Sequence, residues 1–165
     1  MTAEGNTLRK RMLFESWVTA HRAHSLTLAQ QGEPIDRRTV LARLTSLAGR
    51  QRAAEYVYIL SERRPQEDTP AYIGKAKSPM TRWSQHLAGL TKGEGSYARW
   101  RSRFLREGHE TVRFDLALLV VGQDNVQFPP LPDFPTTIGA VEYQLVGLAA
   151  DAYPLRLLNH EGQAR

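Results

Sequence analysis

The part of the sequence that decides the fold reads YVYIL over residues 56–60 and AYIG over residues 71–74. β-Branched and aromatic residues dominate both runs, which is typical of buried strands. A charged loop over residues 61–70 separates the runs, and Gly74 ends the second one. The two runs therefore predict an antiparallel β-hairpin with a long loop.

The residues after the hairpin predict two helices, a third strand and a last helix. A hydroxyl cap followed by a proline marks the first helix, because the cap accepts a bond from a free N–H and the proline has none to satisfy. Residues 111–121 alternate and then become entirely apolar, which favours a strand. Residues 122–135 contain four prolines and predict an irregular loop. These helices and the strand begin at Ser78, Ser96, Thr111 and Thr136 or Thr137.

The first fifty residues predict two helices ahead of the hairpin. One begins at Thr7 and fades by Ser25, and the other is capped by Asp36 and ends near Gly49. The expected fold class is α+β, a small three-stranded antiparallel sheet flanked by helices, with an N-terminal two-helix extension. We expect the extension to span residues 1–53 and the main domain to span residues 54–165.

Composition excludes several classes of site. The chain has 165 residues, a net charge of +5 and no cysteine. Without thiols it cannot form disulfide scaffolds, thiol nucleophiles, iron–sulfur clusters or thiolate zinc sites, so any metal would bind to oxygen or imidazole. No apolar run approaches the length of a bilayer span and no secretory segment is evident. We expect a soluble, intracellular protein that does not associate with membranes.

The charge is unevenly distributed along the chain. Residues 75–113 carry a net charge of +6, whereas residues 114–165 carry −4. This pattern suggests a surface that meets a polyanion, with carboxylates placed separately. Of the 22 cationic residues 18 are arginine, which grips phosphate through a bidentate fork. A GC-rich genome would also enrich arginine, so composition leaves both interpretations open.

One candidate set of functional residues lies on the helix that begins at Ser78. Arg82 and His86 are four residues apart and share a helix face. Directly upstream, Gly74 allows close approach of backbone or substrate, and Lys75 adds a second cation. The alternative is a solvated helix face with an incidental histidine.

Glu142 is the informative residue of the last helix. It lies at the edge of an apolar stripe, which predicts that its carboxylate is partly buried. Carboxylates are seldom buried unless they are paired or bind a metal. A salt bridge to an arginine and a metal site are therefore the two interpretations. The stripe consists of Ile138, Val141, Leu145 and Leu148.

Taken in order, these motifs resemble the GIY-YIG nuclease domain. The resemblance covers about residues 56–159, and two departures are that Tyr56 replaces the glycine of the family name and that the proline loop lengthens the run before the glutamate. Residues 72–77, YIGKAK, are similar to the nuclease of bacterial nucleotide excision repair, and residues 82–86 are similar to phage homing endonucleases. The resemblance rests on the YVY run over residues 56–58, the YIG run over residues 72–74, and Arg82, His86, Glu142 and Asn159.

The resemblance implies a metal-dependent DNA endonuclease with a restriction-like, mobile-element or repair role, located in the cytoplasm of a prokaryote or encoded by a phage. It assigns a single Mg²⁺ or Mn²⁺ to Glu142 and the stabilisation of phosphoryl charge to Arg82. Tyr58 and Tyr72 would line the site, one of them acting as general base or orienting water. The nearby cations would lower the pKa of that phenol. The other catalytic assignments are Lys75 as a cation, His86 as a partner of a tyrosine or phosphate, and Asn159 as the residue that holds the end of the site together.

Further basic residues are expected to contact the nucleic acid. Three arginines follow one face of the helix that begins at Ser96, and such contacts supply affinity and no sequence choice. The alternative is a solvated arginine face. The expected contacts are Lys77, Arg99, Arg103 and Arg106.

The expected partner is double-stranded or branched DNA, and the sequence leaves RNA open. The N-terminal helices could form a homodimer. The rival interpretation of the whole chain is a nucleic-acid-binding module whose nuclease core has lost activity and whose helices dock a partner.

Overall fold

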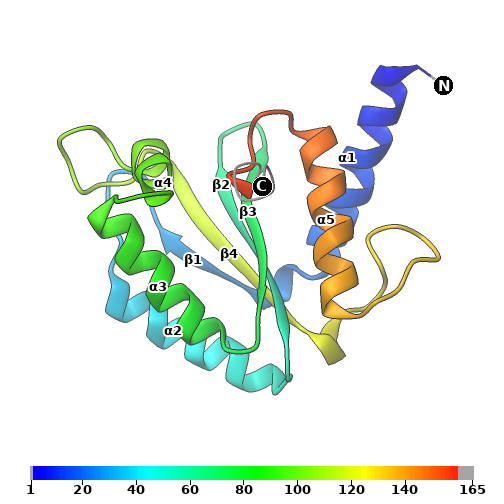
Figure 1. The fold of residues 1–165 in the computed structure, drawn as a ribbon, viewed down its shortest axis with the longest axis horizontal. Helices are drawn as coiled ribbons and strands as arrows, with labels where there is room; N and C mark the ends of the chain where they lie inside the picture. Colours follow the sequence, from blue (N-terminus) through cyan, green and yellow to red (C-terminus); the bar gives the residue numbers. More distant parts are fainter. Residues whose placement is uncertain (1, 160–165) are drawn as a thin grey trace.

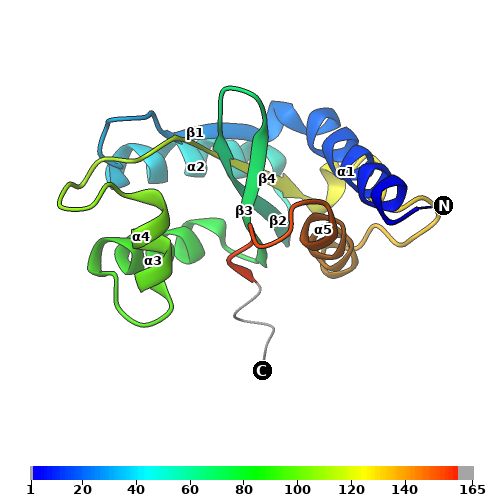
Figure 2. The same cartoon turned by 90° about the horizontal axis from the view of Figure 1, so that it is seen from above.

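The structure, a computed structural model, describes residues 2–159. It is an α+β fold in which one antiparallel sheet lies between two groups of helices (Figures 1 and 2). The strands are β1 (Ser25–Ala29), β2 (Tyr56–Arg63), β3 (Asp68–Ala76) and β4 (Asp115–Gly122). The α-helices are α1 (Ala3–Ala20), α2 (Arg37–Gln51), α3 (Pro79–Lys92), α4 (Tyr97–Phe104) and α5 (Ile138–Ala152). Two short 3-10 helices are η1 (Arg22–His24) and η2 (Gln123–Asn125).

The predicted antiparallel pairing of β2 and β3 is confirmed and forms one side of the sheet. The expected long loop over residues 61–70 is wrong, because residues 61–63 and 68–70 pair with each other as part of the strands. The strand order is β1-β4-β2-β3, so β3 has a strand partner on one side only. Tyr58 lies opposite Gly74, and Leu60 lies opposite Tyr72. The register then shifts. Ser61 of β2 pairs with Pro70, so Ala71 is an extra residue on β3. A bulge of this kind bends a strand and redirects its side chains, here directly before Tyr72.

The sheet has four strands, so the expected three-stranded sheet is wrong in this detail. The additional strand is β1, which pairs with β4 and contains the buried residues Leu28 and Ala29. Helix α1 ends at Ala20 and does not continue to Ser25. The N-terminal segment is therefore two helices with a strand between them, and that strand is part of the same sheet as the hairpin.

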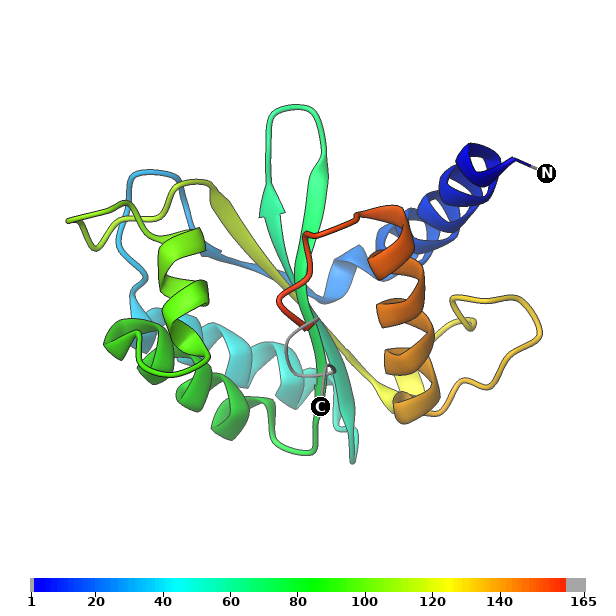
Figure 3. The ribbon, with the colours of Figure 1, turned by 45° about the horizontal axis from the view of Figure 1, so that its top comes forward.

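Helices cover both faces of the sheet (Figure 3), and each face has its own apolar core. Helices α2, α3 and α4 pack on the face that carries Tyr58 and Leu60. Helices α1 and α5 pack on the face that carries Ile59 and Ile73. Trp17 of α1, which is fully buried, is part of this second core. The alternating side chains of β2 thus contribute to both cores.

The start of α3 is fixed as the sequence predicts. The Ser78 hydroxyl accepts a hydrogen bond from the Thr81 amide at 3.3 Å, and Pro79 occupies the first helical position. Gly93 ends the helix in a left-handed conformation, with φ of 66°. No helix within residues 2–159 has the length and apolar character needed to cross a membrane.

Candidate active site

Two tyrosines on adjacent strands form the base of the candidate site. The rings of Tyr58 on β2 and Tyr72 on β3 lie with their centroids 6.1 Å apart and an interplanar angle of 24°. Tyr58 is fully buried, and its ring crosses the backbone of Gly74. A Cβ atom at position 74 would lie 2.4 Å from the Tyr58 hydroxyl oxygen. The glycine is therefore required by the packing of a neighbouring phenol.

His86 on α3 connects this tyrosine pair to α4. Its Nε2 is hydrogen bonded to the Tyr58 hydroxyl at 2.9 Å, and its Nδ1 to the Tyr97 hydroxyl at 2.8 Å. The imidazole also stacks on Trp100, with centroids 4.8 Å apart. Burial, together with the charge of Arg82, lowers the His86 pKa to about 4. The ring is thus neutral near pH 7, with one nitrogen donating and the other accepting, and it contacts tyrosine, one of its two expected partners.

Arg82 is the electrostatic centre of the site. Burial raises the pKa of both Tyr58 and Tyr72, and the positive charge of Arg82 opposes this rise in each. Its charge also lowers the pKa of Glu142. The first turn of α3 therefore places an exposed guanidinium whose charge acts on two phenols and a carboxylate.

Glu142 extends from α5 toward the same region. Burial raises its pKa, the charge of Glu55 raises it further, and Lys75 and Arg82 lower it. Lys75 is exposed, and its amine lies 3.4 Å from where a Cβ atom on Gly139 would be, against the first turn of α5. Glu142 forms no ion pair with another of the described residues. Of the two interpretations of this partly buried carboxylate, the salt bridge is absent within residues 2–159.

The donor set suits a hard metal ion held by few protein ligands. Within the described part of the chain, no group of three or more histidine or carboxylate side chains is arranged around one point. Mg²⁺ keeps several waters and binds through one or two carboxylates together with substrate phosphates. The partly buried carboxylate of Glu142, which has no ion-pair partner within residues 2–159, fits that mode of binding.

Asn159 acts on the strand that carries Tyr72. Its Oδ1 accepts a hydrogen bond from the Ile73 amide at 2.8 Å, and its Nδ2 donates to the Ile73 carbonyl at 2.6 Å. It therefore binds the backbone of β3 beside the site and does not enter the group around Arg82. Six of the predicted residues are brought together here: Tyr58, Tyr72, Lys75, Arg82, His86 and Glu142.

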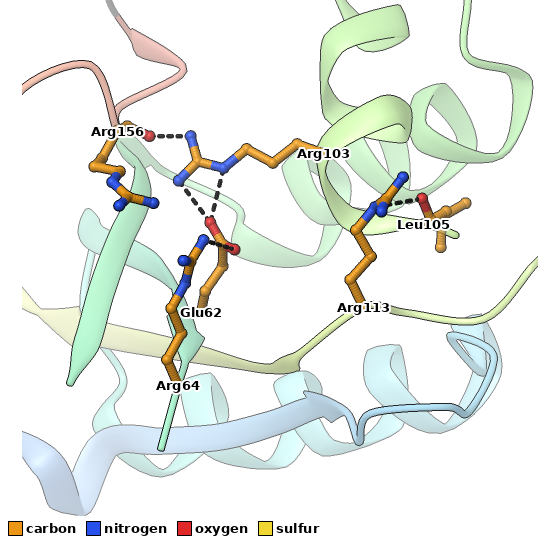
Figure 4. A network of polar contacts seen from close by, with 6 residues as sticks. All are labelled: Glu62, Arg64, Arg103, Leu105, Arg113 and Arg156. Atoms are coloured by element: carbon orange, nitrogen blue, oxygen red, sulfur yellow. Dashed lines mark hydrogen bonds and ion pairs between the residues drawn. The ribbon is translucent and has the colours of Figure 1, made fainter. Parts of the chain in front are cut away.

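The expected DNA contacts divide into two groups. Lys77, Arg99 and Arg106 are exposed. Arg106 follows α4, which ends at Phe104, so it does not extend a row along that helix. Arg103 is turned toward the sheet, where its guanidinium binds the fully buried Glu62 (Figure 4). The single face of three arginines expected from the sequence is therefore not present.

Some residues of the site were not assigned a role from the sequence. Tyr97 and Trp100 lie on the helix expected from Ser96, but their contacts with His86 depend on how α3 and α4 meet. Glu62 occupies the next alternate position along β2 after Tyr58 and Leu60. Because side chains alternate between the two faces of a strand, this spacing could have predicted that Glu62 is buried. Glu55, which acts on Glu142, gave no signal of its own.

Comparison with protein-family models, with curated protein sequences and with solved structures gives no match in any of the three. The activity of the site is therefore inferred from its own residues.

Proposed function

We propose that the protein is a metal-dependent endonuclease that hydrolyses phosphodiester bonds in DNA. The observation that carries this proposal is that four separate elements supply one cation, two phenols and one carboxylate, and that the carboxylate has no ion-pair partner within residues 2–159. Phosphodiester hydrolysis needs an oriented water, neutralisation of charge on the phosphate oxygens and stabilisation of the leaving oxygen. Arg82, Tyr58, Tyr72 and Glu142 offer groups for each of these tasks.

The cations would bind the scissile phosphate. The planar guanidinium of Arg82 can donate two hydrogen bonds to phosphate oxygens, and Lys75 adds a second cation as a point charge on a flexible side chain. Glu142 would hold a Mg²⁺ or Mn²⁺ ion, which when bound supplies further positive charge to the phosphate. Because the Glu142 carboxylate has no other ion-pair partner within residues 2–159, binding a cation would require no existing ion pair to break.

The two tyrosines would have different tasks. Tyr58 is fully buried and its hydroxyl is bonded to His86, so it is held in place and shielded from bulk water. Tyr72 is only partly buried and lies under the same influence of Arg82. We assign to Tyr72 the hydroxyl that orients the attacking water, and to Tyr58 and His86 the support of that arrangement.

The substrate class follows from the exposed cations beside the site. Lys75, Lys77, Arg82 and Arg99 are exposed and belong to the segment with a net charge of +6. Contacts of this kind track a phosphate backbone and make binding depend on salt. Duplex or branched DNA is the proposed substrate, and a cytoplasmic location and a homodimer remain part of the same proposal.

The test is incubation of the protein with plasmid, branched DNA, single-stranded DNA and RNA, each with Mg²⁺, Mn²⁺ or EDTA. We expect the duplex or branched DNA to be cut only with a metal ion. Arg82→Gln should slow cutting by about a hundredfold or more, whereas Arg9→Gln, a change at an exposed arginine on α1, should not. Cutting of RNA alone would contradict the substrate class. Salt-dependent binding of DNA without cutting would support the rival, a binding module without activity.

A further inference from the structure

A fully buried carboxylate lies between two arginines on the same sheet face as Tyr58. Glu62 is 0% exposed, and its Oε1 accepts a hydrogen bond from Arg103 Nε at 2.7 Å. Its Oε2 accepts one from Arg64 Nη2 at 3.1 Å (Figure 4). Separating the partners of a buried ion pair leaves an uncompensated charge, which is costly. The side chains of Glu62, Arg103 and Arg64 are therefore held close to one another.

Arg103 also contacts the C-terminal segment, residues 153–159. Its Nη1 donates a hydrogen bond to the carbonyl oxygen of Arg156 (Figure 4). One guanidinium from α4 thus binds both the β2 carboxylate and the backbone of the C-terminal segment. Arg64 binds Glu62 from the other side, and no hydrogen bond joins it to residues 153–159.

The C-terminal segment in turn lies along the free side of β3. The Leu158 amide donates to the Ala71 carbonyl at 2.7 Å, and Asn159 is bonded to both the amide and the carbonyl of Ile73. Ala71 and Ile73 are the two neighbours of Tyr72. Because β3 has no strand partner on this side and is bulged at Ala71, these bonds fix the backbone that carries the phenol.

We propose that Glu62 and Arg103 are positioning residues of the candidate active site. The ion pair fixes Arg156, the C-terminal segment then fixes the backbone on both sides of Tyr72, and the phenol is held at the geometry that hydrolysis needs. Arg103 acts through this route and does not contact DNA. The effect on catalysis rests on the proposed function, whereas the effect on the β3 backbone does not.

The first test is Arg103→Gln, with Arg64→Gln as its matched control. A glutamine at 103 cannot span from Glu62 to the Arg156 carbonyl, so we expect kcat for plasmid cleavage to fall about tenfold or more while KM stays within about twofold. Hydrogen exchange at the Ile73 amide should become about tenfold faster. Arg64→Gln also removes a guanidinium from Glu62, yet it should leave kcat and the Ile73 exchange rate near the wild-type values.

A second pair of variants separates positioning from stability. Arg103→Lys keeps a positive charge beside Glu62 but cannot bind the Arg156 carbonyl at the same time, so it should fold and still show reduced kcat and faster Ile73 exchange. Combining Arg103→Gln with Asn159→Ala should lower kcat no further than the larger single effect, because both act through one segment.

Several outcomes would overturn the inference. Wild-type kcat and wild-type Ile73 exchange in Arg103→Lys would mean that the ion pair stabilises the fold and does no more. A raised KM with unchanged kcat would make Arg103 a DNA contact, and additive losses in the double variant would exclude a shared route. If the wild-type protein cuts nothing, the proposed function fails, and the Ile73 exchange rates still decide whether Arg103 fixes β3.

Discussion

Gly74 shows how the candidate site depends on the absence of one carbon atom. The sequence predicted close approach of backbone or substrate at this position, whereas the group that approaches in the structure is the Tyr58 phenol. The hydroxyl of that phenol is bonded to His86, so displacement of the ring would also disturb the histidine. The pairing of β2 with β3, the position of the Tyr58 ring and the position of His86 therefore all depend on Gly74.

Gly74→Ala is expected to destabilise the protein by about 2 kcal/mol, since an added methyl group forces the Tyr58 ring out of its packed position. Urea unfolding followed by circular dichroism measures this loss. Gly49→Ala is the matched control, because no atom lies within 4 Å of the added carbon on the exposed face of α2. This control should be neutral or stabilising by up to about 1 kcal/mol. Equal effects of the two changes would contradict the packing described for Gly74.

His86 predicts a specific dependence of stability on pH. Its pKa is about 4 in the folded protein, compared with 6.5 for an ordinary histidine. Between these values the unfolded chain takes up a proton that the folded protein does not, so stability is fully present above pH 6.5 and is lost as the pH falls toward 4. From about pH 7 to about pH 5 the free energy of unfolding should fall by about 2 kcal/mol on account of this residue.

The measurement compares wild type with His86→Gln, because other histidines with lowered pKa values, such as His21, contribute in the same direction to both proteins. The dependence of the unfolding free energy on pH should be less steep in the variant by about 2 kcal/mol over that range. Parallel curves would show that His86 is not held in its neutral form.

At the residue scale, the sequence was informative where a residue's neighbours are close in the chain. Arg82 and His86 share a helix face, and Tyr72, Gly74 and Lys75 lie just upstream, so their proximity could be predicted. The position of Arg103 could not be, because its direction depends on a carboxylate 41 residues away on β2. The effect of the Glu55 charge on the pKa of Glu142 could not be predicted either, because it depends on tertiary packing.

Among the elements, β1 is the one that the sequence did not reveal. Its run SLTLA is five residues long and follows α1 through a single 3-10 turn, so no loop signal separates it from the helix. Its pairing with β4 is a contact between distant parts of the chain. The hairpin of β2 and β3 was predictable because both strands and their connection lie in one continuous segment.

A chain that begins at residue 52 is expected to lose cooperative folding. It would lack β1, which pairs with β4, and both α1 and α2, which cover opposite faces of the sheet. The removed residues include fully buried side chains such as Trp17 and Leu44, whose loss leaves apolar surface exposed. Thermal unfolding followed by circular dichroism would show no sharp transition. A cooperative transition like that of the whole chain would instead support an independent domain over residues 54–165.

At the scale of the whole molecule, the positive segment and the negative segment of the sequence each supply residues to the candidate active site. The segment with a net charge of +6 supplies Lys75 and Arg82, and the segment with a net charge of −4 supplies Glu142. Strands β2 and β3 of the sheet carry the two tyrosines. Cations placed beside a carboxylate of raised pKa are suited to a bound phosphate with a metal ion, and this is the central claim about function.

The most direct test of that claim is cleavage of supercoiled plasmid in Mg²⁺ by wild type, by Glu142→Gln and by the control Glu107→Gln, which alters an exposed glutamate in the loop after α4. We predict that wild type and the control cut the plasmid, and that Glu142→Gln cuts it about a hundredfold more slowly or worse while binding the same DNA with unchanged salt dependence. Cutting by Glu142→Gln at the wild-type rate would contradict the assigned site.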